Sequence, residues 1–297
     1  VLTYDCNLRC PYCYEGASEV YSGKMDRQIA EKAISAIQSK VLKDNSNQLE
    51  ITFFGGEPLL NLPIAELFIN EMHQWAIKEK IEIKFSIVTN GVLIDGNEKF
   101  KSLMAYLDLV RITIDGTKEI HDKKRVTKSG KGTFDKIMAG IKLLKKNNIK
   151  VSLRIQVARD NKVFIPNLIE ELISEDVISS AIADPLVKLD FAALFEMSNL
   201  CGSYYGYLDR QEAIEVAKTI ATYNTTAVPG PQLIPCLVYG NLFAIDPYGD
   251  VYKCLSMLGE KNHRIGFIDT NNEITFEYEM MDFMSRDPLK ISPCKDC

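Results

Sequence analysis

One short segment near the start of this chain reads Cys6-Asn-Leu-Arg-Cys10-Pro-Tyr-Cys13, directly after the apolar run Val1–Asp5. Its three cysteines are separated by three and then by two residues. Thiolates at this spacing fit three corners of a cubane iron–sulfur cluster and leave the fourth iron without a protein ligand. Because an iron with an open position can bind a small molecule, the segment predicts a site of chemistry.

Two other interpretations of the three cysteines are a zinc knuckle and a disulfide pair. A structural zinc ion takes four ligands, and no fourth Cys or His stands within about forty residues of the segment. Disulfides are typical of secreted chains, and nothing in the sequence looks secreted. Zinc is therefore the weaker interpretation, and it stays open at this point.

The spacing, with the aromatic Tyr12 before the last cysteine and an apolar strand before the first, resembles the signature of radical S-adenosylmethionine (SAM) enzymes. The resemblance implies a [4Fe-4S] cluster held by Cys6, Cys10 and Cys13, and it places Tyr12 among the residues that bind the cofactors. In that family the fourth iron chelates SAM, and an electron from the cluster breaks SAM to a 5′-deoxyadenosyl radical. The radical then abstracts hydrogen from a substrate.

The composition is that of an ordinary soluble globular protein: 297 residues, 46% apolar and 25% charged. This length allows one large α/β domain of about 200 residues and a smaller appendage. The net charge of −5 disfavours nucleic acid as the main partner. No apolar run approaches the roughly 20 residues that span a bilayer. We therefore expect a cytoplasmic protein that binds neither nucleic acid nor a membrane.

Strand-like and helix-like segments alternate along the first two thirds of the chain. Strands are expected at 1–5, 49–54, 81–88, 109–114, 150–157 and 187–195, and helices at 26–43, 63–80, 96–106, 134–147 and 164–174. This alternation predicts an α/β fold with parallel strands and right-handed crossovers. Six units are too few for an eight-fold barrel and match the partial (β/α)6 barrel of the radical SAM family. By resemblance, its active site lies at the carboxyl ends of the strands.

The motif Gly55-Gly56-Glu57-Pro58 follows the second expected strand. Glycine has no Cβ, so backbone carbonyls here can come close to a ligand. Alone, these four residues are a common turn, but one unit after the cysteine segment they resemble the GGEP motif of the same family. That resemblance implies that they bind the ammonium group of SAM.

Three further cofactor-binding residues are expected at strand ends. Asn90 in Thr89-Asn-Gly91 and Thr113 in Thr113-Ile-Asp-Gly116 resemble segments that line the SAM pocket, although relatives usually have Ser at the second position. A threonine keeps the hydroxyl group. Arg154, on the fifth expected strand, could bind the SAM carboxylate through two parallel hydrogen bonds, and its alternative is a structural ion pair.

The loop after the fourth expected strand contains His121-Asp122, Arg125 and the run Gly130-Lys-Gly-Thr-Phe134. These residues recur in relatives, and the sequence alone assigns them no role.

The last part of the chain predicts a separate small domain. A proline-rich connector at 225–235 divides the chain into a barrel at 1–224 and a module at 225–297. Two hairpins are expected, around Asp246–Gly249 and within 264–276. The spacing of Cys236 and Cys254 resembles the opening of a SPASM domain, an auxiliary-cluster module, and Cys294 and Cys297 resemble the start of its second cysteine group. The resemblance implies one or two auxiliary [4Fe-4S] clusters, and a zinc ribbon made of these four cysteines is the alternative.

Because the chain starts in a strand and stops on Cys297, we interpret it as part of a longer polypeptide, truncated within the module and preceded by a peptide-binding domain. The resemblance implies a maturase of ribosomal peptides that crosslinks a precursor peptide, most like the streptide-type cyclase that joins a Lys carbon to a Trp ring. Formylglycine or thioether formation is the alternative reaction. The alternative from a different functional class is a non-catalytic iron–sulfur electron carrier or a zinc-binding module. An electron donor, flavodoxin or ferredoxin, is the second implied partner.

Overall fold

The computed structural model describes residues 1–13, 21–179, 184–194, 206–221 and 242–278. At its centre is a parallel sheet whose strands follow the chain order β1-β2-β3-β4-β5. These strands are β1 (Gln48–Phe53), β2 (Glu82–Thr89), β3 (Leu107–Ile114), β4 (Val151–Val157) and β5 (Val187–Ala193). The expected α/β fold with a parallel sheet is confirmed.

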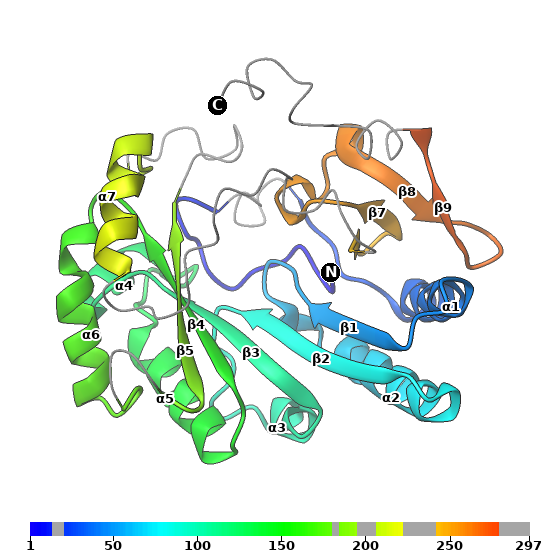
Figure 1. Cartoon of the computed structure of the whole chain (residues 1–297), viewed down its shortest axis with the longest axis horizontal. Helices are drawn as coiled ribbons and strands as arrows, with labels where there is room; N and C mark the ends of the chain where they lie inside the picture. Colours follow the sequence, from blue (N-terminus) through cyan, green and yellow to red (C-terminus); the bar gives the residue numbers. More distant parts are fainter. Residues whose placement is uncertain (14–20, 180–183, 195–205, 222–241, 279–297) are drawn as a thin grey trace.

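Helices connect successive strands. They are α1 (Arg27–Lys43), α2 (Leu62–Glu79), α3 (Glu98–Met104), α4 (Lys118–Lys124), α5 (Phe134–Lys146), α6 (Ile165–Ser174) and, after β5, α7 (Arg210–Ile220). Figure 1 shows α2, α3, α5 and α6 along the outer side of the curved sheet. Their apolar faces pack there because residues such as Ile141 and Leu168 recur at helical spacing and are fully buried. The expected helices are confirmed, and α4 is an addition that the sequence did not predict.

The first expected strand, Val1–Asp5, is shorter than predicted. Thr3 makes an isolated parallel bridge with Gly55 and an antiparallel one with Lys24. The N–H of Leu2 donates to the carbonyl of Phe54 at 2.8 Å, so this segment continues the sheet beside the end of β1. It stops at Asp5 because the chain turns there to carry the cysteine segment across the strand ends.

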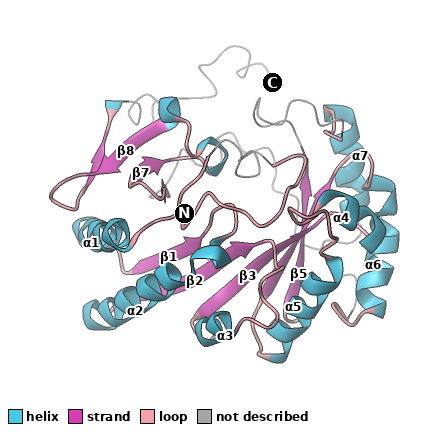
Figure 2. Ribbon diagram, turned by 180° about the vertical axis from the view of Figure 1, so that it is seen from behind, coloured by secondary structure: helices cyan, strands magenta, loops and turns pink. Residues whose placement is uncertain are grey.

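The second sheet is antiparallel and lies on the inner side of the first (Figure 2). Its strands, in sheet order, are β6 (Ala244–Ile245), β7 (Asp250–Tyr252), β8 (Arg264–Ile268) and β9 (Ile274–Phe276). Both expected hairpins are therefore present. The first turn is held by Asp246, whose Oδ1 accepts from the N–H groups of Tyr248 and Asp250.

The N-terminal segment joins the two sheets. The buried hydroxyl of Tyr4 donates to Asp246 Oδ2 at 2.9 Å, and the nitrogen of Val1 donates to the carbonyl of Ile245 at 2.7 Å. Tyr4 also packs with Tyr252 and Leu258 in a small apolar cluster. The cysteine segment is thus fixed between both sheets. None of the helices in the described ranges is long and apolar enough to cross a membrane.

Candidate functional site

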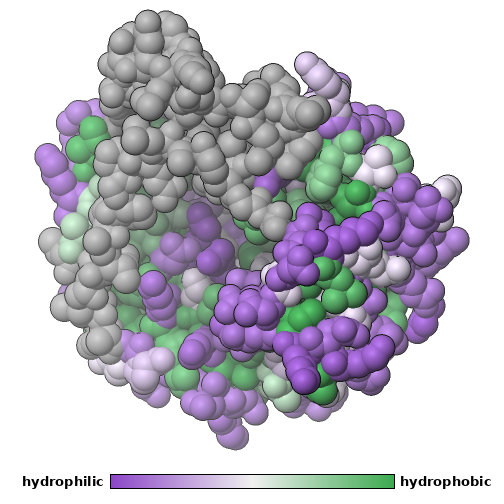
Figure 3. All heavy atoms as spheres, turned by 45° about the vertical axis from the view of Figure 1, so that its right-hand side comes forward, coloured by the Kyte–Doolittle hydropathy of each residue, from purple (hydrophilic) through white to green (hydrophobic). Residues whose placement is uncertain are grey.

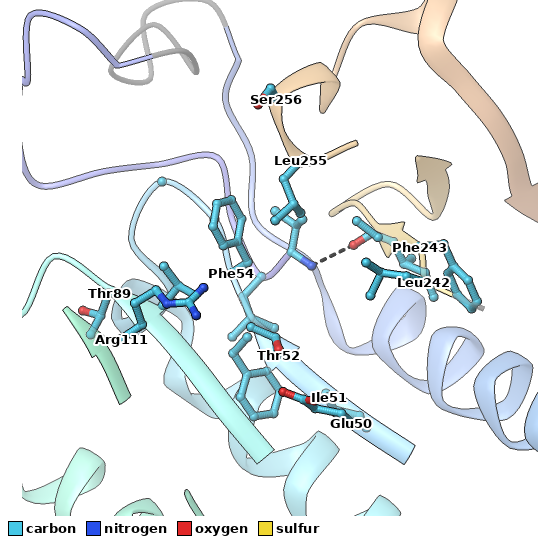
Figure 4. A pocket seen from close by; sticks show the side chains of 18 of the residues that line it. Glu50, Ile51, Thr52, Phe54, Thr89, Arg111, Leu242, Phe243, Leu255 and Ser256 are labelled. Carbon is cyan, nitrogen blue, oxygen red and sulfur yellow. Dashed lines mark hydrogen bonds between the residues drawn. The ribbon is translucent and has the colours of Figure 1, made fainter. Parts of the chain in front are cut away.

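A cavity of about 940 Å³ opens between the carboxyl ends of the parallel strands and the second sheet. Figure 3 shows the molecule hollowed on one face, with hydrophilic and hydrophobic residues in its wall. In Figure 4, Thr52, Phe54 and Arg111 lie on the sheet side of this cavity and Leu242 and Phe243 on the other. The wall includes nine of the predicted site residues: Cys6, Cys10, Tyr12, Cys13, Gly55, Gly56, Asn90, Thr113 and Arg154.

The cysteine segment is held by backbone hydrogen bonds to the loop that follows α4. Leu8 is buried and forms an antiparallel bridge with Thr127, and the Arg9 N–H donates to the carbonyl of Val126 at 3.0 Å. Within the segment, the Leu8 N–H donates to Cys6 Sγ at 3.4 Å. A backbone N–H aimed at a cysteine sulfur is the kind of contact that stabilises a thiolate.

Cys6, Cys10 and Cys13 are partly buried, and none of them forms a disulfide with another described residue. Burial raises the pKa of Cys6 to about 11 and that of Cys10 to about 12, so without a metal both are protonated at neutral pH. The described residues contain no group of three close enough to hold one metal ion together. A cubane cluster would take each of the three thiolates on a different iron.

Two residues of the cavity wall each have one buried polar atom without a hydrogen-bond partner among the described residues. These atoms are Arg125 Nε and Gln156 Oε1. Buried polar atoms are nearly always paired in folded proteins, so each marks a place where a bound group would complete the hydrogen bonding. The residues present therefore fit a bound cluster and a polar small molecule.

Gly55 and Gly56 are required by the chain itself. A Cβ on Gly55 would lie 2.2 Å from the carbonyl oxygen of Thr3, and one on Gly56 would lie 2.6 Å from those of Tyr4 and Asp5. The glycines thus allow the segment that leads into Cys6 to cross the end of β1. The sequence predicts these glycines because a ligand can approach closely there. The structure adds a second reason, the crossing of the backbone at Thr3–Asp5.

Glu57 is fully buried and does not line the cavity. Its Oε1 accepts from the Thr89 hydroxyl at 2.8 Å and the Leu59 N–H at 3.0 Å, and its Oε2 accepts from the Asn90 N–H at 2.8 Å. Burial raises the pKa of this carboxyl, while these three donors lower it. Glu57 therefore joins the ends of β1 and β2, and Pro58 begins the 3-10 turn Pro58–Asn61 behind it.

Asn90 connects the buried Glu57 to the cysteine segment, since its backbone N–H donates to Glu57 and its side chain donates to Asn7. Its side-chain amide donates to Asn7 Oδ1 at 2.7 Å and lies 3.8 Å from Cys6 Sγ. Thr113 and Arg154 are register partners on β3 and β4, and both line the cavity.

Arg154 has a loose ion pair. Its Nη1 lies 3.7 Å from Asp190 Oδ2, and Arg111 Nε lies 3.9 Å from the same oxygen. Both contacts are longer than a hydrogen bond, and the Arg154 side chain is 39% exposed. An ion pair this exposed contributes about 0–1 kcal/mol, so the guanidinium remains available to a ligand.

Tyr12 is at the centre of a buried polar network that the sequence did not predict. Its hydroxyl donates to Asp115 Oδ1 at 2.6 Å and accepts from Arg125 Nη1 at 3.0 Å. Arg125 and Asp115 lie 3.8 Å apart, with side chains 10% and 1% exposed. Burial raises the pKa values of Tyr12 and Asp115, and Arg125 lowers both.

His121 holds this network from behind. The Asp115 N–H donates to its Nδ1 at 3.3 Å, and its Nε2 lies 3.0 Å from Thr133 Oγ1. Because the Thr133 hydroxyl donates to the carbonyl of Arg125 at 2.6 Å, the His121 Nε2 carries the hydrogen. Burial, and then the charge of Arg125, lower the pKa of His121 well below its usual value, so the ring is neutral.

Of the cysteines expected to hold auxiliary clusters, only Cys254 lies within the described residues. It is a partly buried free thiol that follows β7, and its neighbours Lys253 and Leu255 line the cavity. Cys236, Cys294 and Cys297, and the connector at 225–235, lie outside the described residues.

Curated relatives cover different shares of the chain. The uncharacterized protein MJ0907 of Methanocaldococcus jannaschii is 30% identical over 278 residues, 89% of this chain and 87% of that protein. The cysteine-type anaerobic sulfatase-maturating enzyme of Clostridium novyi is 32% identical over 55% of this chain and 44% of its own length. The radical SAM cyclopropyl synthase TigE of Paramaledivibacter caminithermalis is 25% identical over 100% and 64%. The chain thus spans less than two thirds of the last two.

Solved structures share the fold. That of anSMEcpe with bound AdoMet and the Kp18Cys peptide has a TM-score of 0.72 at 22% identity and covers 100% of this chain and 84% of that one. Streptococcus suis SuiB bound to S-adenosylmethionine has a TM-score of 0.64 at 16% identity, with coverage of 99% and 68%.

The family model described as the radical SAM superfamily matches residues 1–197, from the N-terminal segment through all five parallel strands. The matched residues include Cys6, Cys10 and Cys13, the glycines Gly55 and Gly56, and the part of the cavity wall that the parallel strands form. The chain belongs to the radical SAM superfamily, whose members use a [4Fe-4S] cluster and S-adenosylmethionine.

Proposed function

We propose that this chain is a radical SAM peptide maturase that removes hydrogen from a precursor peptide and forms a crosslink in it. The observation that carries the proposal is the cysteine segment: three partly buried cysteines line one cavity together with the strand ends and Arg125, whose Nε has no partner among the described residues. When bound there, the cluster and SAM supply a carbon radical that can take hydrogen from an unactivated C–H bond.

The protein's own residues have separate tasks in this proposal. Cys6, Cys10 and Cys13 hold the cluster, and the cavity edge at Gly55 and Gly56 receives the SAM ammonium group through backbone carbonyls. Glu57 acts indirectly because its carboxylate already has three donors.

Two cavity residues on β3 and β4 complete the SAM site. Thr113 offers a hydroxyl to the ribose, and Arg154 offers two N–H groups to the carboxylate. Asn90 and Tyr12 line the same cavity as the cysteines, where they would contact the bound cofactors; Asn90 donates to Asn7 and Tyr12 precedes Cys13. The site residues thus come from four different strand ends and from the cysteine segment.

A peptide fits the remaining part of the cavity. Beyond the strand ends, the wall continues along β1 to Leu242, Phe243 and Leu255 of the second domain. In this part the side chains of Ile51, Phe54, Leu242, Phe243 and Leu255 give the wall an apolar character that suits peptide side chains. The relatives support the choice, since the anSMEcpe structure contains a peptide beside AdoMet.

Within this class we propose the Lys–Trp carbon–carbon crosslink first, on the layout of the cysteines along the chain. Formation of formylglycine or a thioether is the second candidate, and the Clostridium novyi sulfatase-maturating enzyme favours it. We further propose a barrel at 1–224 and an auxiliary-cluster domain at 225–297, with Cys236, Cys254, Cys294 and Cys297 as ligands of one or two [4Fe-4S] clusters. The proposed electron donor is flavodoxin or ferredoxin.

The test is anaerobic reconstitution with iron and sulfide, followed by reduction in the presence of SAM and the peptide encoded beside this protein. We expect deoxyadenosine and a peptide that has lost hydrogen, detected by mass spectrometry. Replacing Cys6, Cys10 and Cys13 together by Ala should abolish deoxyadenosine. If the reconstituted chain binds iron but never cleaves SAM, it is an electron carrier and the proposal is wrong.

A further inference from the structure

The unassigned motif after β3 has a definite place in the structure. His121 lies on α4, and Arg125 is the C-cap of that helix four residues later, with its N–H donating to the carbonyl of His121, so the two residues occupy the same side of the helix end. That side turns toward the cysteine segment, because Arg125 donates to Tyr12 and the loop after α4 pairs with Leu8 and Arg9. The motif therefore supports the segment that carries the three thiols.

We propose that Arg125 is a positioning residue for the cluster: it holds a fixed positive charge and a free buried N–H beside the cysteine segment, and this makes the cluster easier to reduce. The inference rests on the proposed cluster ligands Cys6, Cys10 and Cys13. It assigns Tyr12 and His121 the task of keeping Arg125 in place, while Asp115 supplies an opposing negative charge beside it.

The charge of Arg125 is retained in spite of burial. A guanidinium stays protonated in proteins, and here its Nη1 lies 3.8 Å from Oδ1 of the buried Asp115. Its side chain is 10% exposed, so water screens the charge only weakly. A reduced cluster carries one more negative charge than an oxidised one, and a nearby buried cation stabilises the reduced form.

Arg125 lies at the same cavity as the cysteine segment. Arg125, Cys6, Cys10 and Cys13 all line that cavity, and Arg125 Nη1 donates to the hydroxyl of Tyr12, the residue before Cys13. The Arg125 Nε also has no partner among the described residues, although it is fully buried. An N–H donated toward cluster sulfur raises the reduction potential in the same direction as the charge.

The remaining contacts make the arginine rigid. The Thr133 hydroxyl donates to the carbonyl of Arg125, and the Arg125 N–H donates to the carbonyl of His121 at 2.8 Å. Asp122 Oδ1 accepts from the N–H groups of Thr133 and Phe134, and a Cβ on Gly132 would lie 2.3 Å from the Asp122 carboxyl carbon. The contacts of the motif thus give physical reasons for His121, Asp122, Arg125, Gly132 and Thr133.

The experiment measures the midpoint potential of the reconstituted whole chain by redox titration without SAM. The EPR signal that later changes on adding SAM identifies the relevant cluster. We expect Arg125→Gln to lower the ratio of reduced to oxidised cluster about tenfold at the wild-type midpoint, a shift of about 59 mV to more negative potential for one electron. Asp115→Asn should shift the potential in the opposite direction.

Opposite signs separate charge from damage, because a disturbed fold gives no reason for two variants to move in opposite directions. Arg125→Lys keeps the charge and should recover most of the potential, and Arg27→Gln, on the exposed start of α1, should change nothing. Unchanged potentials, or shifts of the same sign, in Arg125→Gln and Asp115→Asn would overturn the inference.

Iron content decides the remaining outcomes. If wild-type protein takes up no SAM-responsive cluster, the proposed ligands are wrong, and that failure is distinct from an unchanged potential. If Arg125→Gln alone fails to assemble a cluster, Asp115→Asn decides: a less negative potential supports the inference and an unchanged one overturns it.

Discussion

Glu57 and Thr89, at the ends of β1 and β2, are joined by a hydrogen bond of 2.8 Å from the Thr89 hydroxyl to Glu57 Oε1. The same carboxylate accepts two backbone N–H groups, from Leu59 and Asn90. Replacing Glu57 by Gln would turn an amide NH2 toward donors at a fully buried position. We expect a loss of about 1–3 kcal/mol in the free energy of unfolding, measured by urea denaturation.

The matched control is Glu66→Gln on the exposed side of α2, which should change stability by less than about 0.5 kcal/mol. A Glu57→Gln protein as stable as wild type but unable to bind SAM would show that the carboxylate contacts the cofactor directly.

Gly56→Ala tests how the cysteine segment is positioned. The new Cβ would lie 2.6 Å from two carbonyl oxygens, so the backbone at Tyr4 and Asp5 must move and Cys6 with it. We expect the iron bound after reconstitution to fall at least about threefold, because three ligands must keep their geometry for a cluster to form. Iron and sulfide analysis of the anaerobic protein gives the answer.

Gly130→Ala is the control, since Gly130 has a φ of +80° but no atom within 4 Å of its added Cβ. It should cost about 1 kcal/mol of backbone strain and leave the iron content unchanged. Equal iron loss in both variants would mean that general instability, and not the crossing at Gly56, is responsible.

The parallel sheet and its helices could be predicted because their signals are local. Apolar periodicity identified β1 through β5 and most helices within a few residues, and the glycine turn at Asp246–Gly249 identified the first hairpin of the second sheet. Cys6, Cys10 and Cys13, which the spacing indicated as candidate ligands, all line the cavity.

The Tyr12–Asp115–Arg125 network could not be predicted in the same way. Tyr12 and Asp115 are 103 positions apart in the chain, and nothing in either local sequence records that they touch. The helix α4 that brings Arg125 there has only seven residues, too few for a clear apolar period. A polar motif of His, Asp and Arg directly after a strand was the available signal, and its partners required the fold.

Arg154→Gln should weaken SAM binding by about 1.5–3 kcal/mol, the range for a hydrogen bond to a charged group. The reason is that Arg154 lines the cavity beside Thr113. Its contact with Asp190 is 3.7 Å long, and the two side chains are 39% and 35% exposed. Equilibrium dialysis of SAM against the reconstituted protein measures the affinity.

Arg111→Gln serves as the comparison, because Arg111 lines the same cavity and approaches the same Asp190 oxygen at 3.9 Å. We expect a smaller loss of SAM affinity from it. Equal affinity in wild type and Arg154→Gln would assign Arg154 to the ion pair with Asp190.

The neutral His121 predicts how stability changes with pH. Burial holds the pKa of His121 in the folded chain well below the value of about 6.5 that it has when unfolded. Below about pH 6.5 the unfolded chain binds a proton that the folded chain does not, so the free energy of unfolding falls as the pH falls. The slope from this residue approaches about 1.4 kcal/mol per pH unit. Urea denaturation at pH 7.5 and 5.5 measures it.

His121→Asn should be less stable at both pH values, because it loses the contacts with Asp115 and Thr133, but it should lose less additional stability between them. The raised pKa values of Glu57 and Asp115 act in the opposite direction, since burial favours their protonated forms, and they largely cancel when wild type and variant are compared. If wild type and His121→Asn show the same slope, the His121 ring binds a proton in the folded chain as readily as in the unfolded chain. The assignment of a neutral ring, with hydrogen on Nε2 alone, would then be wrong.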